Sequence, residues 1–168
     1  MDSAPNEGTY LVSSVQESPP TDSRLGLRAS TDADRDWLSV LHEQAHRDLV
    51  ERAYGPWIAA QQREFFAALV DEHTVFVLTH DSEPVGAVYL GERDGDLWLE
   101  LLEISPAHQG RGFGTFALDW IDQAACEQGR GIRLQVHLLN EAAHRLYLKQ
   151  GFTATGETPT HHHLRKHA

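Results

Sequence analysis

Three glycines stand within five positions, at Gly110, Gly112 and Gly114, between an apolar strand-like run and a helix-like run. Because glycine has no Cβ, the backbone N–H groups of such a cluster stay open to an anion. The first turn of the following helix adds partial positive charge at the same place. The stretch 109–115 therefore predicts an anion-binding loop at the start of a helix.

The glycine cluster does not match the common nucleotide-binding loops. A Walker loop needs Lys and then Ser or Thr after its last glycine, whereas Gly114 is followed by Thr and Phe. A dinucleotide fingerprint that starts at Gly110 needs glycine or alanine at Thr115. One that starts at Gly112 reaches Ala117, but it fits loosely and lies late in the chain. We exclude a P-loop and rank a dinucleotide site low.

Turn signals and hydrophobic periodicity divide the rest of the chain into short elements. We expect strands over 25–28, 74–79, 85–91, 97–104, 132–138, 152–157 and 160–165. We expect helices from 32–34 to the break at 55–56, from 56–57 to about 70, over 113–124 and over 141–149. The order β-α-α-β-β-β-α-β-α-β-β predicts a mixed α/β fold rather than a regular βαβ array.

Length and charge favour one acidic domain. The chain has 168 residues, enough for a single core, and 14 Lys and Arg against 25 Asp and Glu give a net charge of −11. This charge argues against nucleic acid as a partner and favours a cationic small molecule. Residues 1–23 are rich in Ser, Pro and acidic residues and hold no Lys or Arg. We therefore expect a flexible leader over 1–23 and the folded domain over 24–168.

Cysteine content and the N-terminus indicate the compartment. Cys126 is the only cysteine, which excludes an intramolecular disulfide and any metal site with several cysteine ligands. The N-terminus lacks the basic start and apolar core of a signal peptide, and no apolar run approaches the roughly 20 residues that cross a bilayer. We expect a cytoplasmic protein with no membrane partner.

Two motifs in the second half of the chain occur in a fixed order. The first is Q-x-x-G-x-G from Gln109 to Gly114, with Pro106 and a strand before it. The second is N-x-x-A-x-x-x-Y-x-x-x-G-F from Asn140 to Phe152. Together they resemble the GNAT superfamily of N-acetyltransferases, in which the first motif is the acetyl-CoA pyrophosphate loop. The resemblance implies a mixed, mostly antiparallel central sheet with helices on both faces.

The resemblance also implies acetyl-CoA as co-substrate, without a metal. The pantetheine arm would lie between two splayed strands and pair with main-chain groups of Leu102, Glu103 and Ile104. Asn140 would hydrogen-bond the pantetheine, and Tyr147 would lie beside it. The pyrophosphate would lie over the N–H groups of the loop, where the expected cofactor-binding residues are Gln109, Gly110, Arg111, Gly112, Phe113, Gly114 and Thr115.

Tyr147 is the expected general acid. Asn140, Ala143 and Tyr147 stand at i, i+3 and i+7, so they share one face of a helix. By resemblance, Tyr147 would protonate the departing CoA thiolate. A phenol of pKa ~10 gives its proton to a thiolate of pKa ~8.5 at a cost of about 2 kcal/mol. The alternative role for Tyr147 is that of a half-buried aromatic residue packed against Phe152.

The acceptor amine must lose a proton before it attacks, because an alkyl amine has a pKa of ~10.4. Glu100 and Glu103 are candidates for the base, and strand alternation predicts that they point to opposite faces. His137 on the next strand and a water chain are further candidates. Acceptor selectivity is expected from residues 47–57 and the closing hairpin, where the candidates that suit a cationic amine are Asp48, Glu51, Tyr54 and Trp57.

An H-E-x-x-H motif competes with this interpretation, at His42-Glu43-Gln44-Ala45-His46. Histidines four apart on a helix can ligate zinc, with Glu43 to activate water and Glu64 as a third ligand. The longer metzincin motif is absent. The alternative is that both histidines flank the apolar stripe of an ordinary helix. A zinc hydrolase is therefore the less favoured function.

Four histidines near the C-terminus, His161, His162, His163 and His167, also suggest a metal site. Adjacent strand residues point to opposite faces, so only His161 and His163 could converge, and we expect a solvated strand instead. The sequence thus favours transfer of an acetyl group from acetyl-CoA to a primary amine of a small molecule or peptide. A non-catalytic acyl-CoA-binding module is the alternative within the same fold, and a homodimer is one assembly that the sequence allows.

Overall fold

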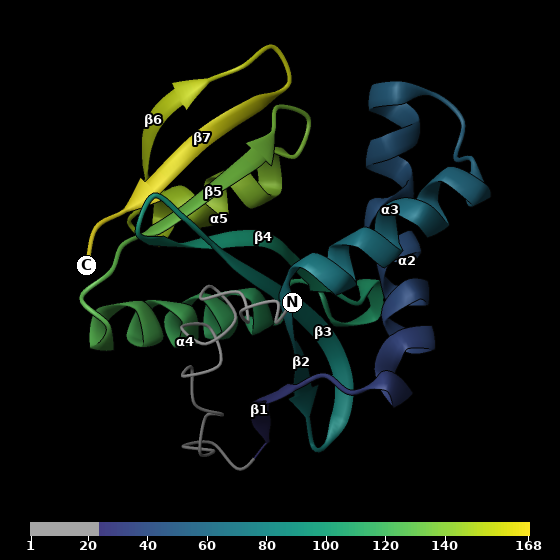
Figure 1. The fold of residues 1–168 in the computed structure, drawn as a ribbon, viewed down its shortest axis with the longest axis horizontal. Coiled ribbons are helices and arrows are strands. Elements are labelled where there is room, and N and C mark those ends of the chain that lie inside the picture. Colours follow the sequence, from purple (N-terminus) through teal and green to yellow (C-terminus); the bar gives the residue numbers. More distant parts are fainter. Residues whose placement is uncertain (1–23) are drawn as a thin grey trace, which may run out of the picture.

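A computed structural model describes residues 24–168, and Figure 1 shows their fold. The flexible leader that we expect over 1–23 lies outside the described residues. The strands form one seven-stranded sheet in the order β1-β2-β3-β4-β5-β7-β6. Only β4 and β5 run parallel, and all other neighbours are antiparallel. The strands are β1 (Leu25–Ala29), β2 (Thr74–His80), β3 (Glu83–Arg93), β4 (Asp96–Ile104), β5 (Ile132–His137), β6 (Thr153–Glu157) and β7 (His161–Lys166).

In the described part of the chain, four α-helices connect these strands, with short 3-10 turns at Asp32–Asp34 and Pro106–His108. The helices are α2 (Arg35–Tyr54), α3 (Ala59–Glu72), α4 (Phe113–Glu127) and α5 (Glu141–Lys149). None of the helices in the described part of the chain is long and apolar enough to cross a membrane. The predicted order of elements and the mixed, mostly antiparallel sheet are confirmed.

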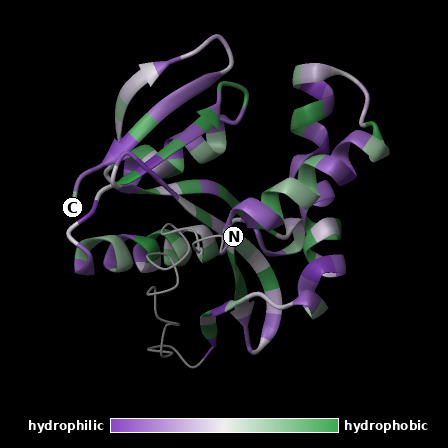
Figure 2. Cartoon of the chain, in the orientation of Figure 1, coloured by the Kyte–Doolittle hydropathy of each residue, from purple (hydrophilic) through white to green (hydrophobic). Residues whose placement is uncertain are grey.

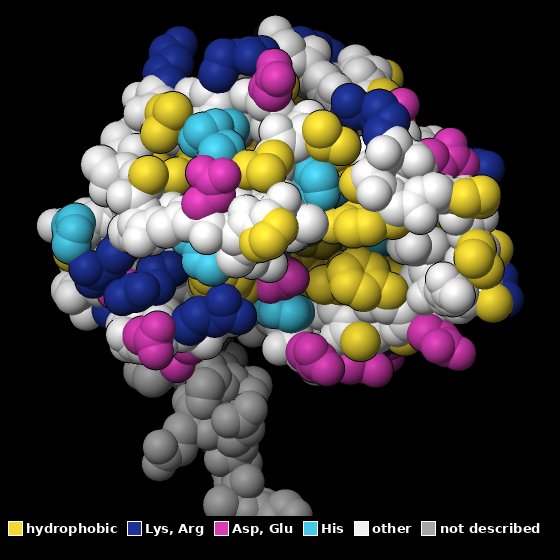
Figure 3. Space-filling model, turned by 90° about the horizontal axis from the view of Figure 1, so that it is seen from above, with side chains coloured by type: hydrophobic (Ala, Val, Ile, Leu, Met, Phe, Trp, Pro, Cys, Tyr) yellow, Lys and Arg dark blue, Asp and Glu magenta, His cyan; other side chains and the backbone are white. Residues whose placement is uncertain are grey.

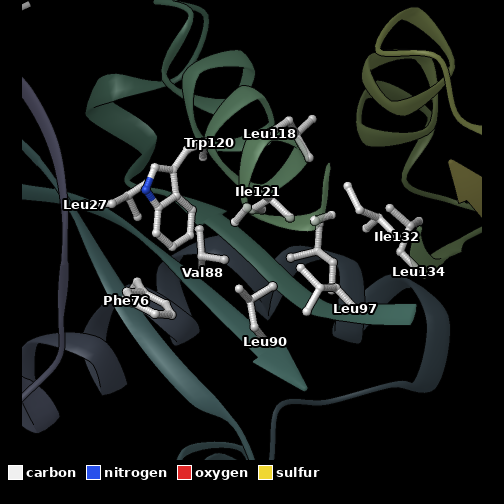
Figure 4. Packing of buried hydrophobic residues seen from close by; sticks show 14 of the residues in the cluster. Leu27, Phe76, Val88, Leu90, Leu97, Leu118, Trp120, Ile121, Ile132 and Leu134 are labelled. Carbon is white, nitrogen blue, oxygen red and sulfur yellow. The ribbon is translucent and has the colours of Figure 1, made fainter. Parts of the chain in front are cut away.

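The sheet is covered by different helices on its two faces (Figure 1). Along β2, alternate residues point to opposite sides. Phe76 and Leu78 pack in the larger core with α4, whereas Val75 and Val77 pack with α2 and α3. Figure 4 shows the larger core, in which Trp120 of α4 lies over Phe76 at a ring separation of 4.9 Å. Figure 2 shows that hydrophobic residues concentrate on the central strands and on α4.

Strands β4 and β5 diverge, which opens the sheet at its middle. Their parallel pairing runs from Leu97 with Ile132 to Leu99 with Leu134 and, within the described residues, goes no further. Strand β4 nevertheless continues to Ile104, still paired with β3 on its other side. Among residues 24–168, the last residues of β4 therefore present an edge without a strand beside it, at the place where the glycine loop begins.

A β-bulge at Glu100 changes which face each side chain of β4 occupies. Tyr89 of β3 pairs with Leu101, but the next residue, Leu90, pairs with Leu99, so Glu100 is an extra residue. Glu100 and Glu103 consequently both lie on the side of α2 and α3. The prediction that alternation sends them to opposite faces was wrong, because the bulge adds one residue to the count.

Asp96 joins the two halves of the opened sheet. Its buried carboxylate accepts hydrogen bonds from Nε of Arg133 and from Nε of Arg165, both at 2.7 Å, and from the Gly131 N–H at 3.1 Å. The guanidinium of Arg165, followed by Arg133 and Gly131, outweighs the effect of burial and lowers the pKa of Asp96 to about 2. One carboxylate at the start of β4 therefore holds β5 and β7 in register.

Candidate active site

The glycine loop is a left-handed turn that leaves its backbone uncovered. Gly110 and Gly112 have φ of 73° and 84°, and a Cβ added at either would meet no atom within 4 Å. Gly112 is the N-cap of α4, whose first intrahelical bond runs from the Phe116 N–H to the Gly112 carbonyl at 3.1 Å. Gln109 donates from Nε2 to the Ile104 carbonyl at 3.0 Å, which ties the loop to the end of β4. The open N–H groups are thus held at a helix start.

A cavity of about 620 Å³ lies against this loop, between α2, the end of β4 and α5. Most of the predicted cofactor-binding residues line it, and they come from the loop, from the unpaired edge of β4 and from α5 with its N-cap. Those that line the cavity are Leu102, Glu103, Ile104, Gln109, Gly110, Gly112, Phe113, Gly114, Thr115, Asn140 and Tyr147. Arg111 does not line it, and its guanidinium lies over the Phe113 ring at 5.2 Å.

Asn140 has a structural role that the sequence analysis did not assign. It is the N-cap of α5, and its Oδ1 accepts a hydrogen bond from the Ala143 N–H at 3.3 Å. Asn140 also lines the cavity. The residue that positions the helix is therefore also one of the polar groups of the cavity wall.

Tyr147 lines the cavity and is also a core residue. Its ring packs edge-on against Phe152 at 5.7 Å, and only 8% of the residue is exposed. Burial raises the pKa of Tyr147 to about 12. Proton transfer from such a phenol to a thiolate of ordinary pKa costs about 5 kcal/mol, so Tyr147 is suited to donate a hydrogen bond to a thiolate in the same apolar surroundings.

His42 and His46 of α2 converge on Glu103 of β4. Oε2 of Glu103 lies 3.3 Å from Nδ1 of His42 and 3.2 Å from Nε2 of His46. Glu103 and His42 are buried, and the His46 side chain is 18% exposed at the cavity. Burial raises the pKa of Glu103, but the two imidazoles outweigh it, so the pKa of this carboxyl lies below its ordinary value.

These polar atoms are close together yet poorly aligned. Among the described residues, none of His42 Nδ1, His46 Nε2 and the two Glu103 oxygens has a hydrogen-bond partner of normal geometry. The buried hydroxyl of Tyr89 also lacks one. Burial and then the charge of Glu103 raise the pKa of Tyr89. The cluster is thus a dense group of buried polar atoms on the α2 side of the cavity.

The structure brings together only part of the zinc site that the H-E-x-x-H motif suggested. The two histidines do face one group, but that group is Glu103 and not Glu64, which is exposed on α3. Glu43 is turned outward and pairs with Arg47 at 2.9 Å. The carboxylate that a zinc hydrolase of this motif would use on water therefore points away from the histidines.

The other two base candidates lie outside the lining of the cavity. Glu100 accepts a hydrogen bond from the Trp98 indole and lies 3.6 Å from Nε2 of His73, in a separate depression beside α3. His137 accepts from the Leu139 N–H at 3.1 Å, and its ring contacts Tyr54 edge-on at 5.7 Å. Of the three candidates, Glu103 alone borders the space beside the glycine loop.

The acidic residues expected to attract a cationic amine have partners. Asp48 accepts from Nε of Arg52 at 2.9 Å, and both residues line the cavity. Glu51 accepts from Nε of Arg47 at 3.0 Å, which offsets its charge. Trp57 lies beside His42, with ring centroids 6.3 Å apart. The α2 side of the cavity, which Asp48 and Arg52 line, is therefore mixed in charge rather than acidic.

The C-terminal histidines take part in separate contacts. His161 lies against His137 at 5.0 Å and reaches the Thr160 hydroxyl at 2.8 Å, whereas the ring of His162 stacks on His144 at 4.1 Å. Seen from above, the surface mixes histidine, acidic and hydrophobic side chains (Figure 3). Among the described residues, a group that could hold a metal is found only at His42, His46 and Glu103.

Comparison with known proteins identifies the class. A family model described as "Acetyltransferase (GNAT) family" matches residues 41–152, and the chain belongs to this family of acetyl-CoA-dependent N-acetyltransferases. The match includes the glycine loop, α5 and the histidine pair of α2. No curated protein matches the sequence.

Solved structures share the fold. The PaiA N-acetyltransferase of Thermoplasma acidophilum in complex with coenzyme A has a TM-score of 0.73 at 16% identity, covering 86% of this chain and 99% of that one. An acetyltransferase from Thermus thermophilus has a TM-score of 0.68 at 26% identity, covering 86% and 97%. Naa50 of Arabidopsis thaliana, in complex with the bisubstrate analogue CoA-Ac-MVNAL, has 0.62 at 18% identity, covering 86% and 99%.

Proposed function

We propose that the protein moves an acetyl group from acetyl-CoA directly to a primary amine of a small molecule or peptide, with Glu103 and His46 as the proton-accepting pair. The observation that carries this proposal is that one cavity is bordered both by residues suited to hold the coenzyme and by residues suited to accept a proton. The glycine loop and α5 supply the donor side, and the Glu103 cluster lies on the α2 side.

The donor side fits a coenzyme with a diphosphate. The open N–H groups at Gly110 and Gly112 lie at the start of α4, where backbone donors and the helix dipole favour an anion. The unpaired edge of β4 at Leu102 and Ile104 offers main-chain groups to the amides of a pantetheine arm. Asn140 lines the same cavity and carries an amide group that can hydrogen-bond the pantetheine.

The proton leaves the amine through His46. Of His42, His46 and Glu103, His46 has the most exposed side chain and reaches the cavity, while the Glu103 side chain is fully buried. His46 therefore meets the amine, and the negative charge of Glu103 stabilises the imidazolium that forms. On the other side of the thioester, the Tyr147 hydroxyl donates a hydrogen bond to the leaving sulfur.

Calorimetry with acetyl-CoA, followed by an amine panel, tests the proposal. We expect one acetyl-CoA per chain and, on addition of polyamines, amino acids or peptides with a free N-terminus, formation of an acetylated product detected by mass spectrometry. Absence of acetyl-CoA binding would refute the proposal. Tight binding without transfer to any amine would instead support a non-catalytic acyl-CoA-binding module.

A further inference from the structure

We propose that His42, His46 and Glu103 bind one divalent transition-metal ion of the Zn²⁺ class, at the side of the cavity where the amine is proposed to lose its proton. The proposal rests on four features of this cluster: its ligand distances, its unpartnered polar atoms, its ligand chemistry and its one open side. The folded protein would bind this metal ion whether or not it catalyses the acetyl transfer proposed above.

The ligand distances fit tetrahedral coordination. Four ligands at roughly 2.1 Å from a zinc ion are separated from each other by about 3.4 Å. The two imidazole nitrogens lie 3.3 and 3.2 Å from Oε2 of Glu103, and the three ligand atoms all lie within 4.8 Å of one another. His46 can adjust the remaining separation because its side chain is 18% exposed and borders open space.

The polar atoms of the cluster need a partner that the described protein does not supply. Buried polar groups in folded proteins nearly always have one, and an unpaired buried carboxylate is costly. Here His42 Nδ1, His46 Nε2 and both oxygens of Glu103 have none of normal geometry, although Glu103 is 1% and His42 4% exposed. A cation between them would partner one nitrogen of each histidine and offset the carboxylate charge.

The ligand chemistry selects a borderline transition metal. Two imidazoles and one carboxylate form a common ligand set of zinc, whereas Mg²⁺ and Ca²⁺ prefer oxygen ligands alone. His42 is fixed by the rings of Phe65 and Phe66 at 5.9 and 5.8 Å, so one ligand is already held in place. The i, i+4 spacing places His46 on the same face of α2.

The fourth coordination position is expected on the cavity side of the cluster, although the ligand atoms themselves are buried. His46 and Glu103 both line it, whereas His42 lies behind them against α3. A water or an amine could therefore complete the coordination from the cavity side. Because the metal uses the lone pair of His46 and the charge of Glu103, the same groups cannot accept a proton while it is bound. An occupied site therefore switches off the proposed base.

Metal titration of chelator-treated protein, purified without an affinity tag, tests the proposal. We expect calorimetry with ZnCl₂ to give one Zn²⁺ per chain, and CoCl₂ to give the visible absorption of tetrahedral cobalt. Glu103→Gln and His46→Gln should each weaken Zn²⁺ binding by more than about 100-fold, beyond the effect of losing an outer-shell contact. Circular dichroism checks that each variant is folded. If Glu103→Gln does not fold, His46→Gln tests the proposal alone, because His46 is partly exposed and its replacement disturbs the core less.

Two control variants exclude other sites. Glu100→Gln changes a carboxylate on the same strand and face, and a double variant, His161→Gln with His163→Gln, changes the C-terminal histidines. Both should retain the affinity of the unmodified protein. No Zn²⁺ binding, binding that survives in His46→Gln, or binding lost with the C-terminal histidines would each overturn the proposal. The acetyl-CoA titration of metal-free protein tests the acetyltransferase proposal separately, so either can fail alone.

Discussion

Nε2 of His46 lies 3.2 Å from Oε2 of Glu103, although one residue belongs to the first long helix and the other to the central strand. The carboxylate is buried, whereas the imidazole reaches the cavity beside the glycine loop. A buried carboxylate that contacts a cavity-facing imidazole orients its ring. The pair thus lies where we propose that the amine binds, and the glycine loop lies where we propose that the coenzyme diphosphate binds.

Replacement of Glu103 by Gln should separate catalysis from coenzyme binding. Without the carboxylate, the imidazolium that forms on His46 loses its stabilising charge, so kcat should fall by roughly 10²- to 10⁴-fold. The affinity for acetyl-CoA, measured by calorimetry, should change little, because the glycine loop is intact. Glu100→Gln, on the same strand but outside the cavity, is the matched control and should keep its kcat. A Glu103→Gln enzyme with unchanged kcat would exclude this base.

The Tyr147 hydroxyl should contribute to turnover and little to coenzyme affinity. Burial raises its pKa to about 12, so it is a weak acid, and its contribution lies at the lower end of the usual range for general acids. Tyr147→Phe keeps the ring contact with Phe152 and should lower kcat by roughly 10²-fold. Steady-state kinetics with calorimetry of acetyl-CoA measures both effects. An unaltered turnover number would remove Tyr147 from the mechanism.

Gly112→Ala should weaken acetyl-CoA binding because alanine disfavours the left-handed backbone of the loop. Gly112 has φ of 84° and caps α4, so alanine would be strained by roughly 1 to 2 kcal/mol in the conformation that leaves the loop N–H groups open. We expect acetyl-CoA affinity to fall at least about tenfold, since hydrogen bonds to a charged group contribute about 1.5 to 3 kcal/mol each.

Gly129→Ala is the matched control for backbone strain. Gly129 has φ of 63° at the other end of α4 and, like Gly112, has open space around an added Cβ. Both variants should lose thermal stability, but only Gly112→Ala should lose coenzyme affinity. Equal affinities in the two variants would contradict the role of the loop as the diphosphate site.

The order of elements was predictable because the chain marks its turns with glycine. Gly55, Gly95 and Gly129 all adopt positive φ and stand within two residues of the end of an element, where a residue with a Cβ would be strained. Local sequence signals of this kind do not depend on the rest of the fold. The two motifs around Gln109 and Asn140 were equally local, and the structure brings both to one cavity.

The surroundings of Glu103, the proposed base, were not predictable, because they depend on contacts between segments far apart in the sequence. The bulge at Glu100 arises from pairing with Tyr89 and Leu90 on another strand, so alternation counted along β4 gives the wrong face. The contact of Glu103 with His42 joins segments far apart in the sequence, and the H-E-x-x-H motif gave the histidines but not their partner. Such contacts depend on tertiary packing.

Asp96→Asn should lower stability in a pH-dependent way. The variant loses charge-assisted bonds to Arg133 and Arg165, but both guanidinium groups are partly exposed and can be solvated, so we expect a loss of roughly 1 to 3 kcal/mol at neutral pH. The folded-state pKa of Asp96 is lowered to about 2, so its stabilisation is present above the unfolded value near 4 and disappears as pH falls through 2.

Chemical denaturation of both proteins at several pH values measures this effect. The difference in unfolding free energy should be constant above about pH 5 and should shrink toward pH 2. Asp119→Asn, at an exposed position of α4, is the control and should leave stability nearly unchanged. A difference that does not vary with pH would contradict the assignment.

Zinc should inhibit acetyl transfer. One equivalent of Zn²⁺ added to chelator-treated enzyme should lower kcat toward the value of Glu103→Gln, because the ion takes the groups that accept the proton. Excess chelator should restore the activity, and the residual activity of Glu103→Gln should not respond to zinc. The acetylated amine must be measured directly, since the released thiol itself binds zinc. An enzyme that is active only with zinc would contradict this prediction and would favour metal-assisted chemistry at the same three residues.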